Sequence, residues 1–327
     1  MLGGALFDRP PDETRAIGGD LGFPVAQVST PVLGEEREVL ELWRIGEDIR
    51  AGSHGRVRYT CSSDILFGSL SLHEDDVPLA PAQSGERTRL YEITAQAYRE
   101  IFATLAAVGH RHLLRVWNYL PEINLQTHGL ERYRQFNSGR QEALIACGHP
   151  ITGNVPAASA LGAASGSALV IYFLACRLAP ALIENPRQVS AYHYPAQYGP
   201  RSPVFSRAAA VGEKDAATLF ISGTSSIVGH RTMHTGDPAA QTRETLRNIE
   251  ALLEEAGRTV LADKLPLESL AYKVYVRDPQ DLPLIRAELT AALGPAASVL
   301  YLKADICRRD LAVEIEAVGG RGLKPGT

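Results

Sequence analysis

The stretch that decides the fold is 237-DPAAQTRETLRNIEALLEEAG-257, because the signals for the start, buried face and end of a helix follow one another in it. Asp237 can accept hydrogen bonds from the free N–H groups of a helix start, and Pro238 suits the first helical position. Gly257 is placed to end the helix. One face is apolar at helical spacing, through Leu246, Ile249, Leu253 and Ala256.

Strand patterns flank this helix on both sides. Four strands and a second helix are expected around it: strands at 204–210 and 217–228 before it, then a strand at 271–276, a helix at 280–293 and a strand at 298–302. The last strand, residues 311–318, alternates, with apolar side chains on one face and Glu314 and Glu316 on the other.

The first half of the chain repeats this order. Its elements are expected as strands at 39–45 and 57–72, a helix at 91–108, a strand at 113–120, a helix at 131–146 and a strand at 168–176. Each half therefore reads strand, strand, helix, strand, helix, strand, which predicts a duplicated unit. We expect an α/β (α+β) fold of mixed sheets with helices packed on one face.

The predicted organisation has four parts. Residues 1–38 are rich in Gly, Pro and charge, which predicts an irregular N-terminal leader. Residues 39–178 form the expected N-terminal α/β domain. Residues 179–318 form the second domain, which includes a crossover at 180–200. A flexible tail is expected at 319–327.

The composition excludes several classes of protein. The chain has 327 residues, of which 45% are hydrophobic and 21% charged, and this excludes disorder, collagen and coiled coil. A net charge of -4 argues against a general nucleic-acid or anionic-membrane partner. The longest apolar run, residues 168–176, is too short for a spanning helix. The N-terminal residues do not resemble a signal peptide, so a cytoplasmic location is expected.

The cysteines and histidines do not predict a metal site. The four cysteines form no CxxC pair, and the nine histidines form no HExxH pattern. We therefore predict neither a metal nor a redox motif, and each cysteine is expected to be a small buried hydrophobe: Cys61, Cys147, Cys176 and Cys307.

Glu314 is the first candidate for chemistry, because it lies within an otherwise apolar strand, LAVEIEAV. If its face of the strand were buried, desolvation would raise the pKa of the carboxyl group and make it a general acid near neutral pH. The alternative is that Glu314 and Glu316 both lie on a solvated strand face.

The segment 190-SAYHYPAQYGPRSPVFSR-207 is the most unusual of the chain, with three tyrosines, two arginines and three prolines. The prolines stiffen it, so that Tyr194, Tyr198, Arg201 and Arg207 are candidates for binding a carboxylate, a group that the planar guanidinium pairs with bidentately. The alternative is a crossover loop whose aromatic rings pack against the two units.

Two further segments are candidates for ligand contacts. Residues 220–230, FISGTSSIVGH, place small residues and hydroxyl groups at a strand end, through Ser222, Gly223, Thr224 and Ser225. This segment lacks the GK[ST] ending of a phosphate-binding loop, so nucleotide binding is disfavoured, and a simple turn is the alternative. Residues 133–140, YRQFNSGR, place Arg140 on a helix, where a solvated face is the alternative.

Taken together, these motifs resemble two related groups of proteins. HTGDPAAQTRETLRNIEALLEEAG, SLAYKVYVRDPQDLPLIRAEL and LAVEIEAV resemble the Rid/YjgF (chorismate-mutase-like) fold. With WNYLPEIN, YRQFNSGR, SAYHYPAQYGPRSPVFSR and FISGTSSIVGH, the chain is similar to the chorismatase family over about residues 39–318. The resemblance implies duplicated Rid/YjgF-like units that act as a monomer or a homotrimer.

The resemblance also implies an activity and roles for residues. Chorismatases hydrolyse the enolpyruvyl ether of chorismate, release pyruvate and use no cofactor or metal. Glu314 corresponds to the acid that protonates the methylene carbon, and Cys307 to a cysteine of the branch that forms 3-hydroxybenzoate, sometimes with 4-hydroxybenzoate. For the two carboxylates of chorismate we expect Arg140 and Arg207, with Arg201 next. Tyr194, Tyr198 and residues 222–225 are expected to orient the ring.

Three alternatives to this function remain open at the level of sequence. The first is a chorismatase that releases a dihydroxycyclohexadiene carboxylate. The second is a Rid-like imine or enamine hydrolase, which is disfavoured because AASVLYLKAD lacks the arginine that Rid deaminases carry in the strand before the last. The third is a non-catalytic module that binds small carboxylates.

Overall fold

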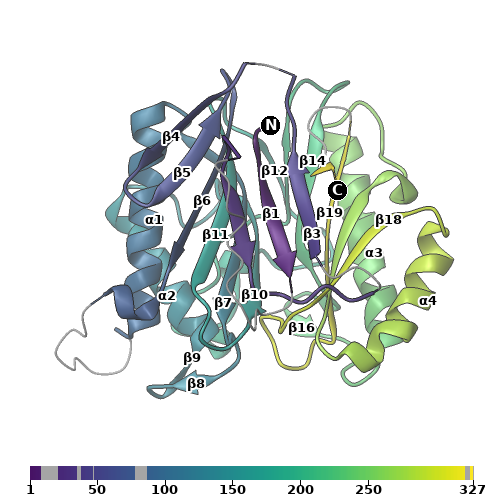
Figure 1. Ribbon diagram of the computed structural model, residues 1–327. Coiled ribbons are helices and arrows are strands. Elements are labelled where there is room, and N and C mark those ends of the chain that lie inside the picture. The colour runs from purple at the N-terminus through teal and green to yellow at the C-terminus, as the bar shows by residue number, and fades with distance from the viewer. Residues whose placement is uncertain (9–20, 35–37, 47, 78–86, 321–324, 327) are drawn as a thin grey trace.

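The computed structural model describes residues 1–8, 21–34, 38–46, 48–77, 87–320 and 325–326. Two six-stranded mixed sheets and one four-stranded sheet account for most of the strands. Figure 1 shows helices α1 and α2 on one side of the molecule, helices α3 and α4 on the other, and the strands between them.

The first unit is built from residues 50–176. Its sheet has the order β10-β7-β11-β6-β5-β4 and carries two helices. The elements are β4 (Arg50–His54), β5 (Val57–Cys61), β6 (Ile65–Leu72), α1 (Arg89–Val108), β7 (His112–Pro121), α2 (Arg132–Ala146), β10 (Ala157–Ala163) and β11 (Leu169–Cys176). A short hairpin, β8 (Gln126–Thr127) and β9 (Leu130–Glu131), precedes α2.

The second unit is built from residues 181–320 and has the same topology. Its elements are β12 (Ala181–Ile183), β13 (Ala208–Val211), β14 (Thr218–Thr224), α3 (Pro238–Thr259), β17 (Ala271–Val276), α4 (Leu282–Leu293), β18 (Ser298–Lys303) and β19 (Val313–Gly320). Its order, β18-β17-β19-β14-β13-β12, matches that of the first sheet strand for strand. In each sheet one pair is parallel, β7 with β10 and β17 with β18. The predicted duplication is therefore confirmed.

Within the two six-stranded sheets, three strands were absent from the predicted order of elements, and one predicted strand is a hairpin. β4 (RAGSH) is a polar edge strand, β10 (AASALGA) has no β-branched or aromatic residue, and β12 has three residues, so none shows a clear strand pattern. The expected strand at 57–72 is the pair β5 and β6, which turns at residues 62–64. Each unit consequently begins with three strands and not two.

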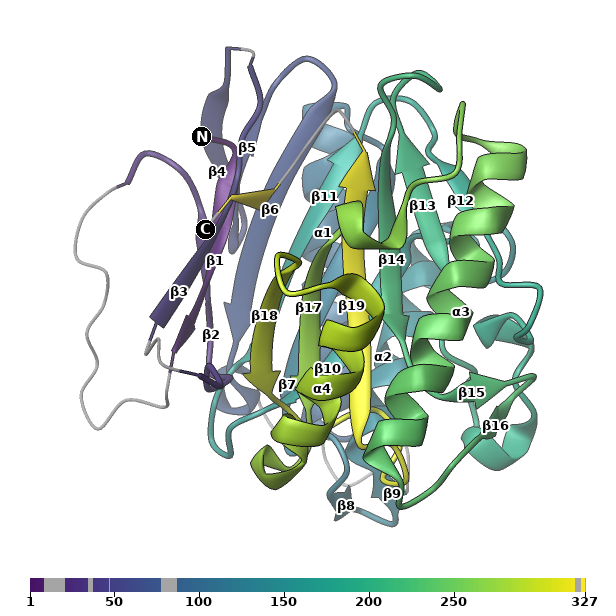
Figure 2. The same cartoon turned by 90° about the vertical axis from the view of Figure 1, so that its right-hand side faces the viewer.

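Three apolar layers form the core of the molecule, and one of them joins the two units. One lies between the first sheet and α1 and α2, and another between the second sheet and α3 and α4. The third lies between the two sheets and contains aromatic side chains from both units and from β3: Trp43, Trp117, Tyr119, Tyr172, Phe220 and Tyr275. The side view in Figure 2 shows α3 and α4 over one face of β17, β18 and β19.

The leader was predicted to be irregular, and this is wrong for its described strands. β1 (Gly3–Asp8) pairs with β2 (Val25–Val28) and with β3 (Glu38–Trp43) in the four-stranded sheet. The sequence pattern did not predict β1, because GGALFD combines glycines with a short apolar run. Its side chains fill the layer between the units, as the full burial of Phe7 shows. Residues 9–20 of the leader lie outside the described residues.

The tail was predicted to be flexible, and four of its residues are strand residues instead. Residues 319–320 complete β19, and β20 (Pro325–Gly326) pairs with β3. The rest of the tail lies outside the described residues. Among the described helices, none combines the length and apolar character that crossing a membrane requires.

The helix that decides the fold begins where the sequence predicts and ends later. Asp237 accepts a hydrogen bond from the Ala240 N–H at 2.9 Å, and Pro238 is the first helical residue. Gly257 does not end the helix, which continues to Thr259. A Cβ at Gly257 would lie 2.9 Å from the Lys264 Cα, so this glycine allows the following chain to pack closely.

Close packing of α1 against α2 generates the first prediction. A Cβ at Gly139 of α2 would lie 2.3 Å from the Tyr91 carbonyl oxygen of α1. We expect Gly139→Ala to lower the free energy of unfolding by about 1–3 kcal/mol through overpacking, although alanine normally favours a helix. Urea denaturation measures the change.

Gly46→Ala is the control, since no described atom lies within 4 Å of the added Cβ there. If Gly139→Ala unfolded at the same urea concentration as the wild type, the close approach of the two helices would be refuted.

Candidate active site

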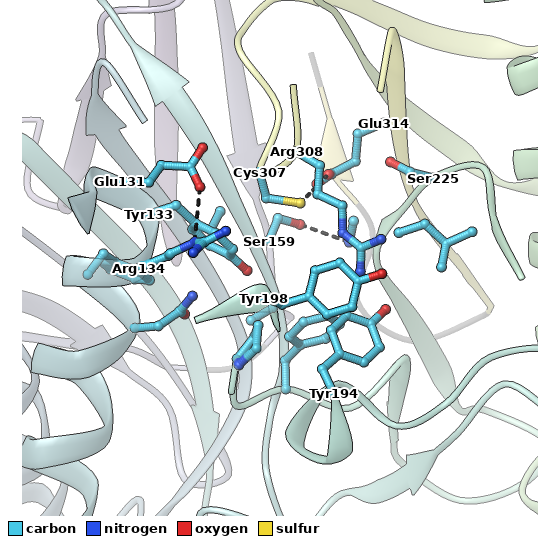
Figure 3. Close-up of a pocket in the computed structure, with 18 of the residues that line it drawn as sticks. Glu131, Tyr133, Arg134, Ser159, Tyr194, Tyr198, Ser225, Cys307, Arg308 and Glu314 are labelled. Carbon is cyan, nitrogen blue, oxygen red and sulfur yellow. Dashed lines mark hydrogen bonds and ion pairs between the residues drawn. The ribbon is translucent and has the colours of Figure 1, made fainter. Parts of the chain in front are cut away.

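A cavity of about 440 Å³ lies between the two units. Its walls come from α2, from β10, from the irregular segment that joins the units, and from the loop before β19. The residue types that face it are mainly tyrosine, arginine and small hydroxyl side chains. Figure 3 shows the labelled side chains converging on the space between these elements.

Glu314 lies on β19 and points into this cavity (Figure 3). Its residue is only 4% exposed, so the alternative of a solvated strand face is excluded for Glu314. Burial, together with the negative charge of Glu316, raises the pKa of the Glu314 carboxyl group to about 8. At neutral pH this group therefore holds a proton that it can donate.

Gly223 of β14 allows Glu314 to occupy this place. A Cβ on Gly223 would lie 1.9 Å from the Glu314 Oε1, so a larger residue would displace the carboxyl group. The Gly223 N–H donates to the Ser159 Oγ at 3.0 Å, which ties β14 to β10 beside the acid.

Cys307 is the nearest described sulfur to the acid, with its Sγ 4.0 Å from the Glu314 Oε2. Burial, with the charge of Glu314, raises the pKa of the Cys307 thiol to about 12. The side chain is consequently a neutral thiol at physiological pH. It can shape the wall and act as a weak donor, but it lacks the thiolate that nucleophilic catalysis requires.

Tyr133 of α2 forms part of the same wall. Burial, together with the nearby Cys307, raises the pKa of its phenol well above the usual range. The hydroxyl therefore stays protonated beside Cys307 and Glu314 and is available as a neutral hydrogen-bond donor.

Arg140 is a buried cation without an opposite charge. It lies on α2, is 3% exposed, and stacks over the Tyr98 ring with its guanidinium carbon 5.0 Å from the centroid. Among the described residues, no carboxylate lies within ion-pair distance of it, and its Nε has no hydrogen-bond partner. A buried unpaired charge is costly, so an anion in the cavity would stabilise this arrangement.

Arg207 and Arg308 add two more cations to the walls. The Arg207 Nη2 donates to the Tyr194 hydroxyl and to the Val189 carbonyl, both at 2.8 Å, while its Nε has no described partner. Arg308 lies over the Tyr198 ring at 4.1 Å from the centroid, and its Nη2 has no described partner. The three arginines thus each present a buried nitrogen that is free to donate to a ligand.

The structure brings eight of the eleven expected site residues to the cavity. They are Glu314, Cys307, Arg140, Arg207, Tyr194, Tyr198, Gly223 and Ser225. Arg201 is exposed and does not line it. Ser222 and Thr224 point away from it: the Ser222 Oγ donates to the Ser206 carbonyl at 2.6 Å, and the Thr224 Oγ1 to the Ser222 carbonyl at 2.8 Å.

Several lining residues were not singled out from the sequence. Tyr133 begins the segment YRQFNSGR, a motif noted from the sequence, whereas Arg308 follows Cys307 directly but lies in none of the motifs. Ser159 gave no signal, because it lies on β10, a strand that the pattern did not reveal. Arg134 also lines the cavity, and its Nε lies 3.5 Å from a carboxylate oxygen of Glu131.

A cavity of this volume, lined by arginines, tyrosines and a buried acid, defines a site for a small molecule. Comparison with known proteins identifies the family. The model "Chorismatase FkbO/Hyg5-like, N-terminal" matches residues 41–175. A 3-hydroxybenzoate synthase of Streptomyces hygroscopicus is 34% identical over an alignment of 310 residues, and the alignment covers 91% of this chain and 86% of that protein. A chorismatase of Streptomyces rapamycinicus is 39% identical over 305 residues, with the same two coverages.

A solved structure agrees with these relatives. A chorismatase crystal structure matches 98% of this chain and 92% of its own, with a TM-score of 0.81 and 32% identity. The chain belongs to the chorismatase family. The resemblance inferred from the motifs is confirmed.

The raised pKa of Glu314 generates the second prediction. A carboxyl group whose pKa rises from 4.5 to about 8 on folding holds its proton more tightly in the folded state between these values. Folded-state stability is therefore lost as the pH rises through this window. We expect Glu314→Gln, which has no proton to lose, to gain stability relative to the wild type by about 1 kcal/mol per pH unit there.

Urea denaturation from pH 5 to pH 9 measures this difference. The gain is expected to level off above pH 8. A gain that did not depend on pH would show that Glu314 ionises normally in the folded protein.

Proposed function

We propose that this protein cleaves the enolpyruvyl ether of chorismate to give pyruvate and 3-hydroxybenzoate, with 4-hydroxybenzoate as a minor product. The observation that carries the proposal is the pairing, in one cavity, of a protonated buried carboxyl group at Glu314 with buried arginines whose Nε atoms have no described hydrogen-bond partner, Arg140 and Arg207. The relatives named 3-hydroxybenzoate synthase and chorismatase support the same reaction.

The first chemical step is protonation of a carbon atom. Glu314 donates its proton to the methylene carbon of the enol ether, and positive charge develops at the ether carbon. A neutral carboxylic acid whose pKa lies near the working pH is suited to this transfer. The carboxylate left on Glu314 then faces the developing positive charge and stabilises it. If water attacks the ether carbon and loses a proton, the resulting hemiketal breaks to pyruvate and the dihydroxycyclohexadiene carboxylate. If instead the neighbouring ring hydroxyl oxygen bonds to the ring carbon that carries the ether, the ring C–O bond breaks, pyruvate leaves with the ether oxygen as its carbonyl oxygen, the hydroxyl proton is released, and the ring rearranges to 3-hydroxybenzoate.

The arginines suit the two carboxylates of chorismate. Arg140 and Arg207 are the expected partners, and Arg308 joins them because it lines the same cavity and its Nη2 has no described hydrogen-bond partner. Charge-assisted hydrogen bonds from guanidinium to carboxylate are strong and directional. Tyr194 and Tyr198, which support Arg207 and Arg308 through ring contacts, are expected to orient the ring of the substrate.

The product assignment depends on Cys307, which the family resemblance associates with the 3-hydroxybenzoate branch. A neutral thiol 4.0 Å from the acid fills space that water could otherwise occupy. Less water beside the reacting carbon favours attack by the ring hydroxyl group over hydrolysis to the diene. The cytoplasmic location, the absence of a cofactor and the choice between a monomer and a homotrimer stay predictions.

The third prediction tests the reaction directly. Purified protein incubated with chorismate is expected to release pyruvate and 3-hydroxybenzoate, detected by a coupled lactate dehydrogenase assay and by chromatography. Glu314→Gln is expected to fold and to lose about 10²–10⁴-fold in kcat, because an amide cannot donate the proton. Glu250→Gln, on the exposed side of α3, is the matched control.

The possible products separate the alternatives. If the wild type released no pyruvate, the proposed activity would be refuted, and hydrolysis of imines or saturable binding without turnover would then be tested. Pyruvate together with a non-aromatic diene alone would keep the chorismatase activity and refute the 3-hydroxybenzoate assignment.

The fourth prediction concerns substrate binding. Arg140→Gln is expected to lower kcat/KM by about 10²–10³-fold through loss of a charge-assisted contact, and Arg201→Gln to leave it near the wild-type value. Arg201 is the matched control because it is exposed and lies outside the cavity. Equal losses in both variants would contradict the assignment of the carboxylate site to the cavity.

A further inference from the structure

A second carboxylate is buried two residues after the first. Glu316 lies on the same face of β19 as Glu314 and is 3% exposed, yet it does not line the cavity of Glu314. It borders a separate space of about 380 Å³ between the second sheet and β3. The function proposed for Glu314 assigns no task to it.

Glu316 accepts three hydrogen bonds and makes one further ion pair, so that each of its oxygens has two partners. Its Oε1 accepts from the Trp117 Nε1 at 2.7 Å and lies 2.9 Å from the Lys273 Nζ. Its Oε2 accepts from the Arg115 Nη2 at 2.6 Å and from the Ser159 Oγ at 2.7 Å. A carboxylate with this many donors has little reason to take up a proton.

The charges around Glu316 come from three other strands. Lys273 of β17 and Arg115 of β7 are the cations, and Glu41 of β3 is a second anion, 2.7 Å from the Lys273 Nζ. Burial opposes ionisation of Glu316, but the charges of Lys273 and Arg115 outweigh it, and the pKa of Glu316 is lowered. Burial raises the pKa of Glu41 despite the adjacent Lys273. Of the two carboxyl groups beside Lys273, that of Glu316 is therefore the one that is ionised more readily.

A short chain of contacts connects Glu316 to the acid. The Ser159 Oγ that donates to Glu316 also accepts the Gly223 N–H, at 3.0 Å. Gly223 in turn lies against the Glu314 carboxyl group, as the missing space for a Cβ shows. The anion at Glu316 and the wall behind Glu314 are therefore one hydrogen-bonded assembly.

We propose that Glu316 is a positioning residue, a permanent buried anion that keeps Glu314 protonated for the reaction. Two carboxylates on one strand face lie about 7 Å apart, and at this distance inside a protein a second negative charge is disfavoured. The inference rests on the proposed function of Glu314 as the acid.

The other groups that face Glu314 do not replace this effect. Arg115 and Arg277 are cations, and their charges lower the pKa of Glu314. Tyr133 of α2 and Cys307 of the loop before β19 are neutral at physiological pH, because burial raises both of their pKa values. Among the described charges, that of Glu316 has the largest effect on the pKa of Glu314, and it raises this pKa.

The test measures the titration of Glu314 without any substrate. The stability difference between each protein and its Glu314→Gln counterpart is followed by urea denaturation against pH. This difference changes between the unfolded-state and the folded-state pKa of Glu314 and levels off above the folded-state value; the upper bend, which is the midpoint of the folded-state titration, reports the pKa of Glu314. The wild-type midpoint is expected at about 8. Glu316→Gln is expected to lower it by about 1–2 pH units and to move the alkaline limb of kcat by the same amount.

Charge and shape are separated by a conservative variant. Glu316→Asp keeps the charge but shortens the side chain, so its midpoint is expected to stay within about half a pH unit of the wild type. Tyr119→Phe is a neutral control in the same interior, since it removes the 2.7 Å contact with the Tyr275 hydroxyl without changing any charge. Its midpoint is expected not to move.

A double variant serves if Glu316→Gln does not fold. Glu316→Gln with Lys273→Met replaces a buried ion pair by neutral side chains, a change that proteins often tolerate. Its midpoint is expected to fall as well, because Glu316 is the charge closer to Glu314. A midpoint unchanged in the folded charge-removing variant, or lowered equally by Glu316→Asp, would overturn the proposal.

Failure of the proposed function gives a different result. A wild type that does not turn over chorismate but whose midpoint falls in Glu316→Gln would refute the reaction and keep the electrostatic role. A wild type that is active and whose midpoint does not respond would keep the reaction and refute the role of Glu316.

Discussion

Burial of charge between the two sheets is the constraint on which this structure depends. Lys273, Arg115 and Glu316 lie at the interface of the units and are each at most 8% exposed. Such groups are stable inside a protein only when their hydrogen bonds are complete, and breaking one leaves an uncompensated charge. The two units are therefore held in one relative position by contacts that specify geometry as well as by apolar packing.

The duplication explains where the site lies, and its departures from symmetry explain what the site does. β7 and β17 are equivalent strands, and their Tyr119 and Tyr275 hydroxyl groups meet at 2.7 Å between the sheets. Around this symmetric contact the chemistry differs. The second unit carries the acid on β19, whereas the equivalent strand β11 is apolar throughout (LVIYFLAC). One unit thus supplies the acid, and the other supplies α2 with Arg140.

The sequence revealed the helices, the duplication and most of the site, for physical reasons that differ. The helices were found because capping residues and apolar spacing are local, as at Asp237. β1 and β10 were missed because their positions depend on partners far away in the chain. Glu314 was found through its apolar neighbours, but its burial also depends on the first unit, whose α2 and β10 form the other walls of the cavity. Arg201 was expected at the site because it shares a segment with Arg207, and sequence proximity does not decide which side chain turns inward.

The saturated hydrogen bonds of Glu316 also bear on how the acid recovers between turnovers. In the proposed reaction Glu314 becomes a carboxylate when it protonates the methylene carbon, and the attacking hydroxyl group or water gives up one proton later in the same cycle. Behind Glu314, Ser159 and Gly223 are engaged with each other and with Glu316, so no described group there is free to hand over a proton. The proton that reloads Glu314 must therefore come from the cavity side, where the attacking oxygen releases it. The acid is then restored by the substrate itself, and the interior behind it acts as an insulating wall.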